Sequence, residues 1–170
     1  MELSIVPENM AAIQAAFASA PEITLKHVAR AIDESLLLAQ REIAERTPTG
    51  AHQLLRKSIL AAEAVDFAKP VPGGVMGVVG TSINYAVPVE LGTRPHFPPL
   101  APLEDWAVAK LGVERTQAKS VAWAIAKKIA KTGTTGAFMF RDGFAAVEPY
   151  IQTRLVKAVD DALAEIAGQA

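Results

Sequence analysis

The chain has 170 residues, of which 51 % are apolar and 21 % charged, and its formal net charge is -1. These values are ordinary for a globular protein and argue against a protein that coats duplex DNA, because such proteins are usually clearly basic. The sequence predicts one domain over residues 1–170. It contains no cysteine, no signal peptide and no long apolar run, so we expect a protein of the cytoplasm with no disulfide and no membrane span.

Two helices are predicted in the N-terminal part of the chain. The first is short and amphipathic, with apolar residues at Met10, Ile13 and Phe17. Ser19-Ala20-Pro21-Glu22 is typical of a capping box, so a second helix is expected from there to about Arg46. Thr47-Pro48 should end it, since the residue before a proline is disfavoured in the α region.

The second helix has two apolar surfaces. Helical spacing predicts one buried face, made of Leu25, Val28, Ile32, Leu36, Ala39 and Ile43. Leu37 and Leu38 lie outside that face, among charged residues. Either a loop of the same chain or another protomer can cover them, because exposed apolar patches commonly mark interfaces.

Strands are predicted in the middle of the chain. One is expected between Ser58 and Ala68, and a clearer, β-branched one runs from Val75 to Gly80. The turn at Pro70–Gly74 is predicted to be longer than a two-residue hairpin loop. The fold class is therefore α+β, with helices at both ends of the chain and a small antiparallel β-sheet near the middle.

A proline-rich segment follows these strands. Five of the eleven prolines lie between Pro88 and Pro102. Proline fixes φ and has no backbone N–H, so the segment should form an extended arm rather than a buried strand. We hypothesise that residues 94–102, the proline arm, lie against a neighbouring protomer or ring.

The C-terminal half is predicted to be helical. Expected helices start at Pro102 and end at Gly112, run from Gln117 to Lys131, and run from Pro149 to about Ala167. Between the last two, Ala137–Phe140 is a short apolar segment that could be a strand or a plug.

No pattern in the sequence indicates catalysis, a metal site or a cofactor. His27, His52 and His96 are far apart and belong to no metal-binding or nucleophile motif. Adjacent acids such as Asp33-Glu34 do not face each other on a helix, so they are interpreted as solvated faces. A small hydrolase would require one histidine to meet an acid in a pocket.

Basic residues are concentrated between positions 110 and 131. Only one acid, Glu114, accompanies six cations there: Lys110, Arg115, Lys119, Lys127, Lys128 and Lys131. Such a region can be a solvated helix face, a contact for an acidic partner, or a non-specific phosphate contact. A protein or solvent contact is favoured over nucleic acid because Trp123 is the only aromatic residue nearby. A cytoplasmic nucleic-acid-binding module stays as the alternative function.

The block from Tyr85 to Thr93 has a possible role for each polar residue. Tyr85 can bury its ring and expose its hydroxyl. Glu90 can accept backbone N–H groups at a turn or pair with Arg56 or Arg94, and Gly92 permits a positive φ. A well-packed turn alone would account for each residue taken singly.

Three short elements resemble a family of tailed-bacteriophage tail components, the neck or tail-completion proteins of long-tailed phages and prophages. Thr47-Pro48-Thr49-Gly50 with the following Leu54-Leu55-Arg56-Lys57-Ser58-Ile59 resembles "TPxxTG-x-LRxSI", although His52-Gln53 lengthen the turn. Tyr85-Ala86, Val89-Glu90 and Gly92-Thr93 match "YAxxVExGT". Ile129 with Gly133-Thr134 resembles a later "I-x-x-x-GT" element.

The resemblance implies an α+β fold in which a small antiparallel β-sheet packs against a long helix, with further helices in the C-terminal half. It also implies a structural virion protein without enzymatic activity at the head–tail junction. It implies a ring homo-oligomer, six-fold in expectation, that contacts neighbouring connector and tail proteins and surrounds the DNA passage. The expected subunit or ring contacts are Leu37, Leu38, Tyr85, Glu90, Gly92, Thr93, Arg94, Pro95, Phe97 and Pro98. Lys127, Lys128 and Lys131 are expected to face an acidic partner or DNA in the lumen.

Overall fold

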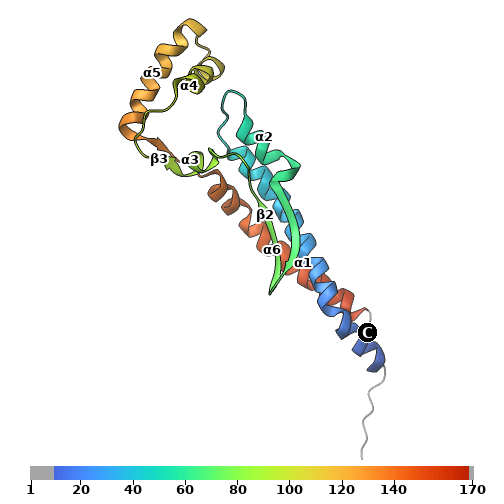
Figure 1. Cartoon of the computed structure of the whole chain (residues 1–170). Helices are drawn as coiled ribbons and strands as arrows, with labels where there is room; N and C mark the ends of the chain where they lie inside the picture. The colour runs from blue at the N-terminus through green and yellow to red at the C-terminus, as the bar shows by residue number, and fades with distance from the viewer. Residues whose placement is uncertain (1–9, 169–170) are drawn as a thin grey trace, which may run out of the picture. The chain divides into compact units, whose positions relative to one another are not determined.

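The structure, a computed structural model, describes the backbone of residues 10–168 and, apart from residues 10–13 and 17, their side chains (Figure 1). The elements in chain order are α1 (Met10–Arg46), α2 (Leu54–Leu60), the 3-10 turn η1 (Ala62–Ala64), β1 (Val65–Val71), β2 (Gly74–Val79), α3 (Ala86–Leu91), β3 (Gly92–Thr93), α4 (Leu100–Trp106), the π-helical η2 (Ala107–Leu111), α5 (Arg115–Thr132), β4 (Thr134–Thr135) and α6 (Met139–Ala167).

The chain divides into two compact units, each built from discontinuous segments. Unit 1 comprises Met1–Leu38, Val65–Val78 and Val147–Ala170, and unit 2 comprises Ala39–Ala64 and Val79–Ala146. The predicted fold class, α+β, is confirmed. A two-stranded sheet packs against the long helix α1, and most of the other helices come after this sheet in the chain. Among the described helices, none combines the length and apolar character needed to cross a membrane.

The predicted break between two N-terminal helices is wrong, because α1 is continuous and contains Pro21. Ser19 does not cap a new helix: its Oγ donates backwards to the carbonyl oxygens of Ala15 and Ala16, at 3.2 and 3.1 Å. Such bonds to residues three and four positions earlier occur within helices. Met10, Ile13 and Phe17 belong to α1, but their side chains, and with them the predicted apolar face, lie outside the described residues.

In unit 1, the β1–β2 hairpin packs against α1. A Cβ at Gly77 would lie 3.2 Å from Ile32 Cγ2, so the missing side chain allows the strand to approach the helix closely. Asp33 Oδ1 accepts the Ala68 N–H at 2.7 Å, which fixes the hairpin to the same helix. The hairpin loop is only Pro72-Gly73, shorter than predicted, and the φ of +88° at Gly73 fits the glycine position of a type II turn.

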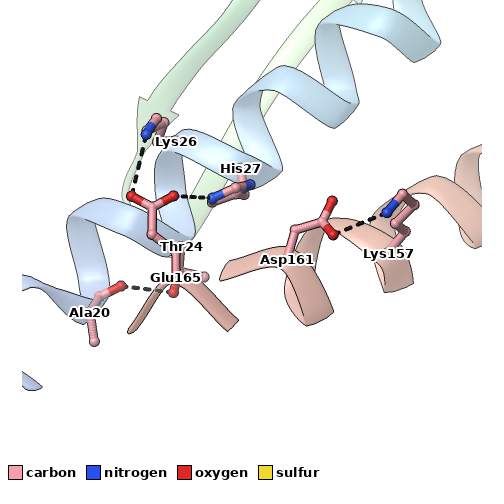
Figure 2. Close-up of polar contacts among 7 residues, drawn as sticks. All are labelled: Ala20, Thr24, Lys26, His27, Lys157, Asp161 and Glu165. Atoms are coloured by element: carbon pink, nitrogen blue, oxygen red, sulfur yellow. Dashed lines mark hydrogen bonds and ion pairs between the residues drawn. The ribbon is translucent and has the colours of Figure 1, made fainter. Parts of the chain in front are cut away.

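Charged side chains join α1 to α6 within unit 1 (Figure 2). Glu165 Oε2 lies 2.7 Å from His27 Nε2, and Glu165 Oε1 lies 3.4 Å from Lys26 Nζ. The hydrogen bond with His27, together with the Lys26 ammonium, lowers the pKa of Glu165 below its ordinary value. His27 is therefore part-buried between α1 and α6, with Glu165 as its partner.

A second pair, Glu34 and Arg154, also joins α1 to α6. Arg154 Nε donates to Glu34 Oε2 at 2.6 Å, and this bond, with a further one from Arg30, lowers the pKa of Glu34. Because the carboxylate is favoured in the folded state, the pair stabilises the protein above the ordinary Glu pKa of about 4.3. Its contribution is lost as the pH falls below that value, towards the lowered pKa.

We expect Glu34→Gln to lower the melting temperature at pH 7 and to have little effect near pH 3. The loss should be below about 1 kcal/mol, because the pair is partly exposed to solvent. Thermal unfolding followed by circular dichroism at both pH values measures the difference. Asp161→Asn, which removes an exposed pair with Lys157 in the same unit, is the matched control. A pH-independent effect of Glu34→Gln would contradict the assignment.

In unit 2, the segment predicted as a strand from Ser58 begins as helix α2, and the strand starts only at Val65. Gln40 explains part of this difference. Its side-chain amide donates to the carbonyl oxygens of Ile59 and Ala61, at 2.8 and 3.0 Å, where α2 ends. The last carbonyls of a helix have no partner within the helix, and Gln40 satisfies that of Ile59, while the Ala61 carbonyl also accepts the Ala64 N–H at 3.1 Å. Ile59, inside α2, is fully buried.

The remaining helices of unit 2 pack through small residues. Ala118, Ala122 and Ala126 of α5 are fully buried, and α4 and α5 are in extensive contact. Gly112, with φ +66°, ends η2 as predicted. Alanine at these positions lets the helix axes approach closely, in agreement with the alanine-rich composition.

The last helix begins ten residues before the predicted start at Pro149, which lies inside it. The short segment predicted as a strand or plug therefore supplies the first turn of α6, and Met139 is completely buried there. In the same helix Gly143 lies against the backbone of Ile43 in α1, where a Cβ would be 3.0 Å from its Cα.

Candidate functional site

The elements singled out in the sequence meet in unit 2. The two Gly-Thr pairs form a short antiparallel ladder in which Gly92 pairs with Thr135 and Thr93 with Thr134. The hydroxyls of Thr93 and Thr134 are 2.9 Å apart, and Thr93 Oγ1 also accepts the Thr134 N–H at 3.2 Å. Residues 41 positions apart are thus held together by backbone and side chain.

Three glycines make this ladder possible, and we call them the glycine crossing: Gly92, Gly133 and Gly136. A Cβ at Gly92 would collide with Thr134 O, one at Gly133 with Thr93 O, and one at Gly136 with Glu90 O. Gly92 and Gly133 have φ values of +80° and +70° with ψ near 180°, a region open essentially to glycine alone. The positive φ predicted for Gly92 is confirmed.

Glu90 holds the start of α6. Its carboxylate oxygens accept the N–H groups of Phe140 at 2.9 Å and Arg141 at 3.1 Å, and its backbone carbonyl accepts the N–H of Phe138 at 3.1 Å. Glu90 was expected to accept backbone N–H groups at the Gly-Thr turn, but the donors lie about 50 residues further along. In the described part of the chain it forms no ion pair with Arg56 or Arg94.

The first two family-like elements line one cleft of about 660 Å³. Thr49 and Leu55 lie on one side, Tyr85 and Val89 on another, and Pro102 of α4 completes it. Lys110 Nζ donates to Thr49 Oγ1 at 2.8 Å, which ties η2 to the turn beside this cleft. The cleft is mainly apolar, so it is suited to receiving an apolar side chain.

His52 and Asp105 also line this cleft. Asp105 forms an ion pair with Arg115 at 2.7 Å, and no hydrogen bond joins it to His52 in the part of the chain that the structure describes. His96 Nδ1 lies 2.9 Å from Arg94 O, while His27 belongs to unit 1. The three histidines are therefore not brought together within either unit.

A second hollow, of about 560 Å³, lies beside α3 and is bordered by exposed apolar side chains. Val87 and Leu91, one helical turn apart on α3, are 63 % and 66 % exposed and line it together with Phe140. Phe144, the next turn of α6, is 54 % exposed. Exposed apolar side chains commonly mark a protein–protein contact when they form a large patch.

The predicted contact residues fall into two groups. Glu90, Gly92 and Thr93 are engaged within the chain, as described above. The others are exposed or half-buried: Leu37, Leu38, Tyr85, Arg94, Pro95, Phe97 and Pro98. The extended conformation predicted from Pro88 onwards is wrong as far as Leu91, because α3 accommodates Pro88 in its first turn, where backbone N–H groups have no helical partner.

The proline arm contacts its own chain. Phe97 packs edge-to-face on Trp123 of α5, with ring centroids 6.2 Å apart, while Arg94, Pro95 and His96 are exposed. Helix α4 already begins at Leu100, so the non-helical part of the arm is residues 94–99.

The basic residues of α5 lie on its exposed side. Lys127 Nζ sits 3.8 Å above the Trp123 ring centre, a cation–π contact, and Lys128 and Lys131 are exposed. Within the described residues these three lysines have no carboxylate partner. Phe97 is a second aromatic residue at this face that spacing along the sequence did not reveal.

Sequence reasoning missed Val87, Leu91 and Phe144 as exposed apolar residues, and Gly133 and Gly136 as partners of Gly92. The spacing of Val87 and Leu91 would have indicated one helix face if Pro88 had been placed in a first helical turn. Within the described residues, no group of three or more His, Asp or Glu is placed to hold a metal ion. No protein-family model, curated protein or solved structure matches this chain.

Proposed function

We propose that this chain is a structural virion protein of the head–tail junction of a tailed bacteriophage, which closes a ring of identical subunits around the DNA passage. The proposal rests on the resemblance of the Thr47–Ile59, Tyr85–Thr93 and Ile129–Thr134 elements to tail-completion proteins. The observation that carries it is that unit 2 gathers these elements beside an uncovered apolar area of Val87, Leu91 and Phe144.

A ring requires a heterologous contact, in which one patch of a subunit meets a different patch of the next. The exposed α3 area supplies one patch, and the exposed residues of the arm, Arg94–His96, offer a stiff segment beside it. Proline reduces the conformational entropy that such a segment loses on docking. Neighbouring connector and tail proteins would contact the two faces of the ring.

We expect Val87→Ser with Leu91→Ser to weaken self-association by about tenfold or more, because both side chains would be buried between subunits. Sedimentation velocity measures the association, and negative-stain microscopy shows whether rings form. Leu60→Ser with Leu111→Ser removes two equally exposed leucines of unit 2 that do not line the hollow, and should assemble like the wild type. A wild-type chain that remains monomeric at every concentration would contradict the proposed function.

A nucleic-acid-binding module is the second candidate. The specific observation in its favour is that helix α5 exposes Lys127, Lys128 and Lys131 together with Trp123, which contacts Lys127 and Phe97. Binding of this kind would fall steeply with salt, since each phosphate contact releases counterions. Unchanged affinity for a DNA duplex after reversal of the three lysine charges would exclude this use of the face.

A further inference from the structure

The charges of the chain are divided unevenly between its two units. The described part of unit 1 has eight Asp and Glu against five Lys and Arg, whereas unit 2 has eight against twelve. Unit 1 is therefore acidic, at -3, and unit 2 is basic, at +4. Two copies can attract each other if unit 2 of one meets unit 1 of the next, and complementary surfaces of this kind set the register of an interface.

Three of the cations of unit 2 lie along one ridge of α5. Lys119, Trp123, Lys127 and Lys131 follow one another at intervals of four residues, the spacing that forms a ridge on a helix surface. All four are exposed, α5 contains no acid, and the three lysines have no carboxylate partner among the described residues. The ridge is therefore basic with one aromatic position.

A ridge of the opposite character lies on the unit 1 part of α6. Glu148, Gln152, Val156 and Asp160 also recur every four residues, and all are exposed. Neither acid has a cation partner in the described chain, unlike Asp161, which pairs with Lys157. Val156, Val159 and Leu163, 63 %, 44 % and 59 % exposed, form an uncovered apolar strip along this ridge.

We propose that α5 of one copy packs antiparallel on α6 of a second copy, with Lys119 opposite Asp160, Trp123 opposite Val156 and Lys131 opposite Glu148. Both ridges extend over twelve residue steps, a rise of about 18 Å at 1.5 Å per residue, so the charges at both ends meet when the two helix axes cross at about 50°, the angle at which ridges of this spacing align. The aromatic position of one ridge then meets the apolar strip of the other. Lys127 faces Gln152, a neutral hydrogen-bond acceptor.

Orientation and partner both follow from this match. A parallel arrangement would also pair the end charges, but it would place Trp123 on Gln152 and Lys127 on Val156, which buries two polar groups against apolar ones. Nucleic acid would satisfy the lysines but would leave the α6 strip unexplained.

The inference rests on the proposed function in that it takes self-association as given, and it names the helices that meet. Lys119→Glu with Lys131→Glu, and separately Glu148→Lys with Asp160→Lys, should each weaken association by about tenfold or more in sedimentation velocity. An equimolar mixture of the two double variants should assemble again, because every contact between unlike copies regains opposite charges.

The control variant changes the net charge by the same amount, but at positions outside the ridge. Lys57→Glu with Lys128→Glu reverses one exposed lysine of α2 and one exposed lysine of α5 that lies off the ridge. It should assemble like the wild type. Circular dichroism establishes that each variant is folded. If the mixture of the two ridge variants assembles, a variant that does not assemble alone was not misfolded.

Orientation can be tested with engineered disulfides, because the chain has no cysteine of its own. Lys119→Cys with Asp160→Cys should give bands of two or more chains on oxidation, whereas Lys119→Cys with Glu148→Cys should not. The opposite result would overturn the antiparallel register. Only cysteines whose Cα atoms come within about 7 Å can form the bond.

Different failures have different meanings. If the wild type assembles and the ridge variants assemble equally well, the helix pairing is wrong while the proposed function stands. A monomeric wild type overturns both. If the α5 variant assembles normally but loses binding to a fluorescent DNA duplex, the ridge is a nucleic-acid contact and the pairing is overturned.

Discussion

Gly133→Ala is expected to destabilise unit 2 by about 3–5 kcal/mol, a large part of the total stability of an ordinary domain. Two effects act together. The new Cβ would collide with the Thr93 carbonyl oxygen and lie 2.9 Å from the Arg94 carbonyl carbon, both of which are backbone atoms that cannot rotate away. The φ of +70° with ψ of -158° is also strained for any residue with a side chain.

Tryptophan fluorescence can follow the unfolding of unit 2 alone. The chain has two tryptophans, Trp106 and Trp123, and both belong to unit 2, so their emission during urea unfolding follows that unit. Circular dichroism measured in parallel follows both units. We expect Gly133→Ala to shift the fluorescence transition to much lower urea and, if the units unfold separately, to leave part of the helical signal unchanged.

Two further glycines separate the causes. Gly136 has no positive φ, so Gly136→Ala tests the collision with Glu90 O without added backbone strain. Gly50 belongs to the first family-like element but has open space around it, and Gly50→Ala should be neutral. Equal unfolding midpoints for Gly133→Ala and Gly50→Ala would show that the glycine crossing does not require glycine.

Local patterns in the sequence predicted the elements whose cause is local. Strand β2, helix α5 and the end of η2 at Gly112 follow from β-branched residues, helical spacing and a glycine C-cap. The α+β class followed from the same patterns. The conformation of Gly92 was predictable too, because glycine before a threonine at a turn indicates a positive φ.

The errors arise where distant contacts override local signals. Pro21 and Pro149 were each predicted to lie at the start of a helix, but both lie inside a longer helix. Tertiary packing overrides the local signal at these positions. The first three residues of the strand predicted from Ser58 to Ala68 belong to helix α2, where Gln40, about twenty residues earlier, donates to the carbonyls of Ile59 and Ala61. The strand itself begins at Val65. No local rule predicts a partner at that separation.

The candidate site was predictable in its residues but not in its arrangement. The sequence identified Glu90, Gly92 and Thr93 as important, and the structure places each of them in contact with Thr134–Arg141. Which of two Gly-Thr pairs meets which depends on the whole path of the chain between them. The exposure of Val87 and Leu91 likewise depends on α3 being helical.

Glu90→Ala is expected to cost about 2–4 kcal/mol, because it removes a charged acceptor from two N–H groups at the start of α6. Phe140 and Arg141 would be left without their partner, and the negative charge that favours a helix N-terminus would be lost. Phe138, which has a φ of +49°, would keep its bonds to the backbone carbonyl of residue 90 and to the Asp142 N–H.

Amide hydrogen exchange resolves this effect by residue. Opening of the first turn of α6 should raise exchange at Phe140 and Arg141 far more than at the centre of α5. Glu90→Gln retains one acceptor oxygen without the charge, so its midpoint should fall between those of the wild type and Glu90→Ala. Glu63→Ala, an exposed acid of the same unit, should leave both measurements unchanged.

The Glu90 variants also connect stability to assembly. Glu90 and Phe140 both line the hollow beside Val87 and Leu91, so loss of the bond to Phe140 should disturb the apolar area proposed to contact the next subunit. At a temperature where Glu90→Gln is still folded, we therefore expect weaker association than in the wild type. If association is unchanged while exchange at Phe140 rises, the hollow beside α3 is not part of the subunit contact.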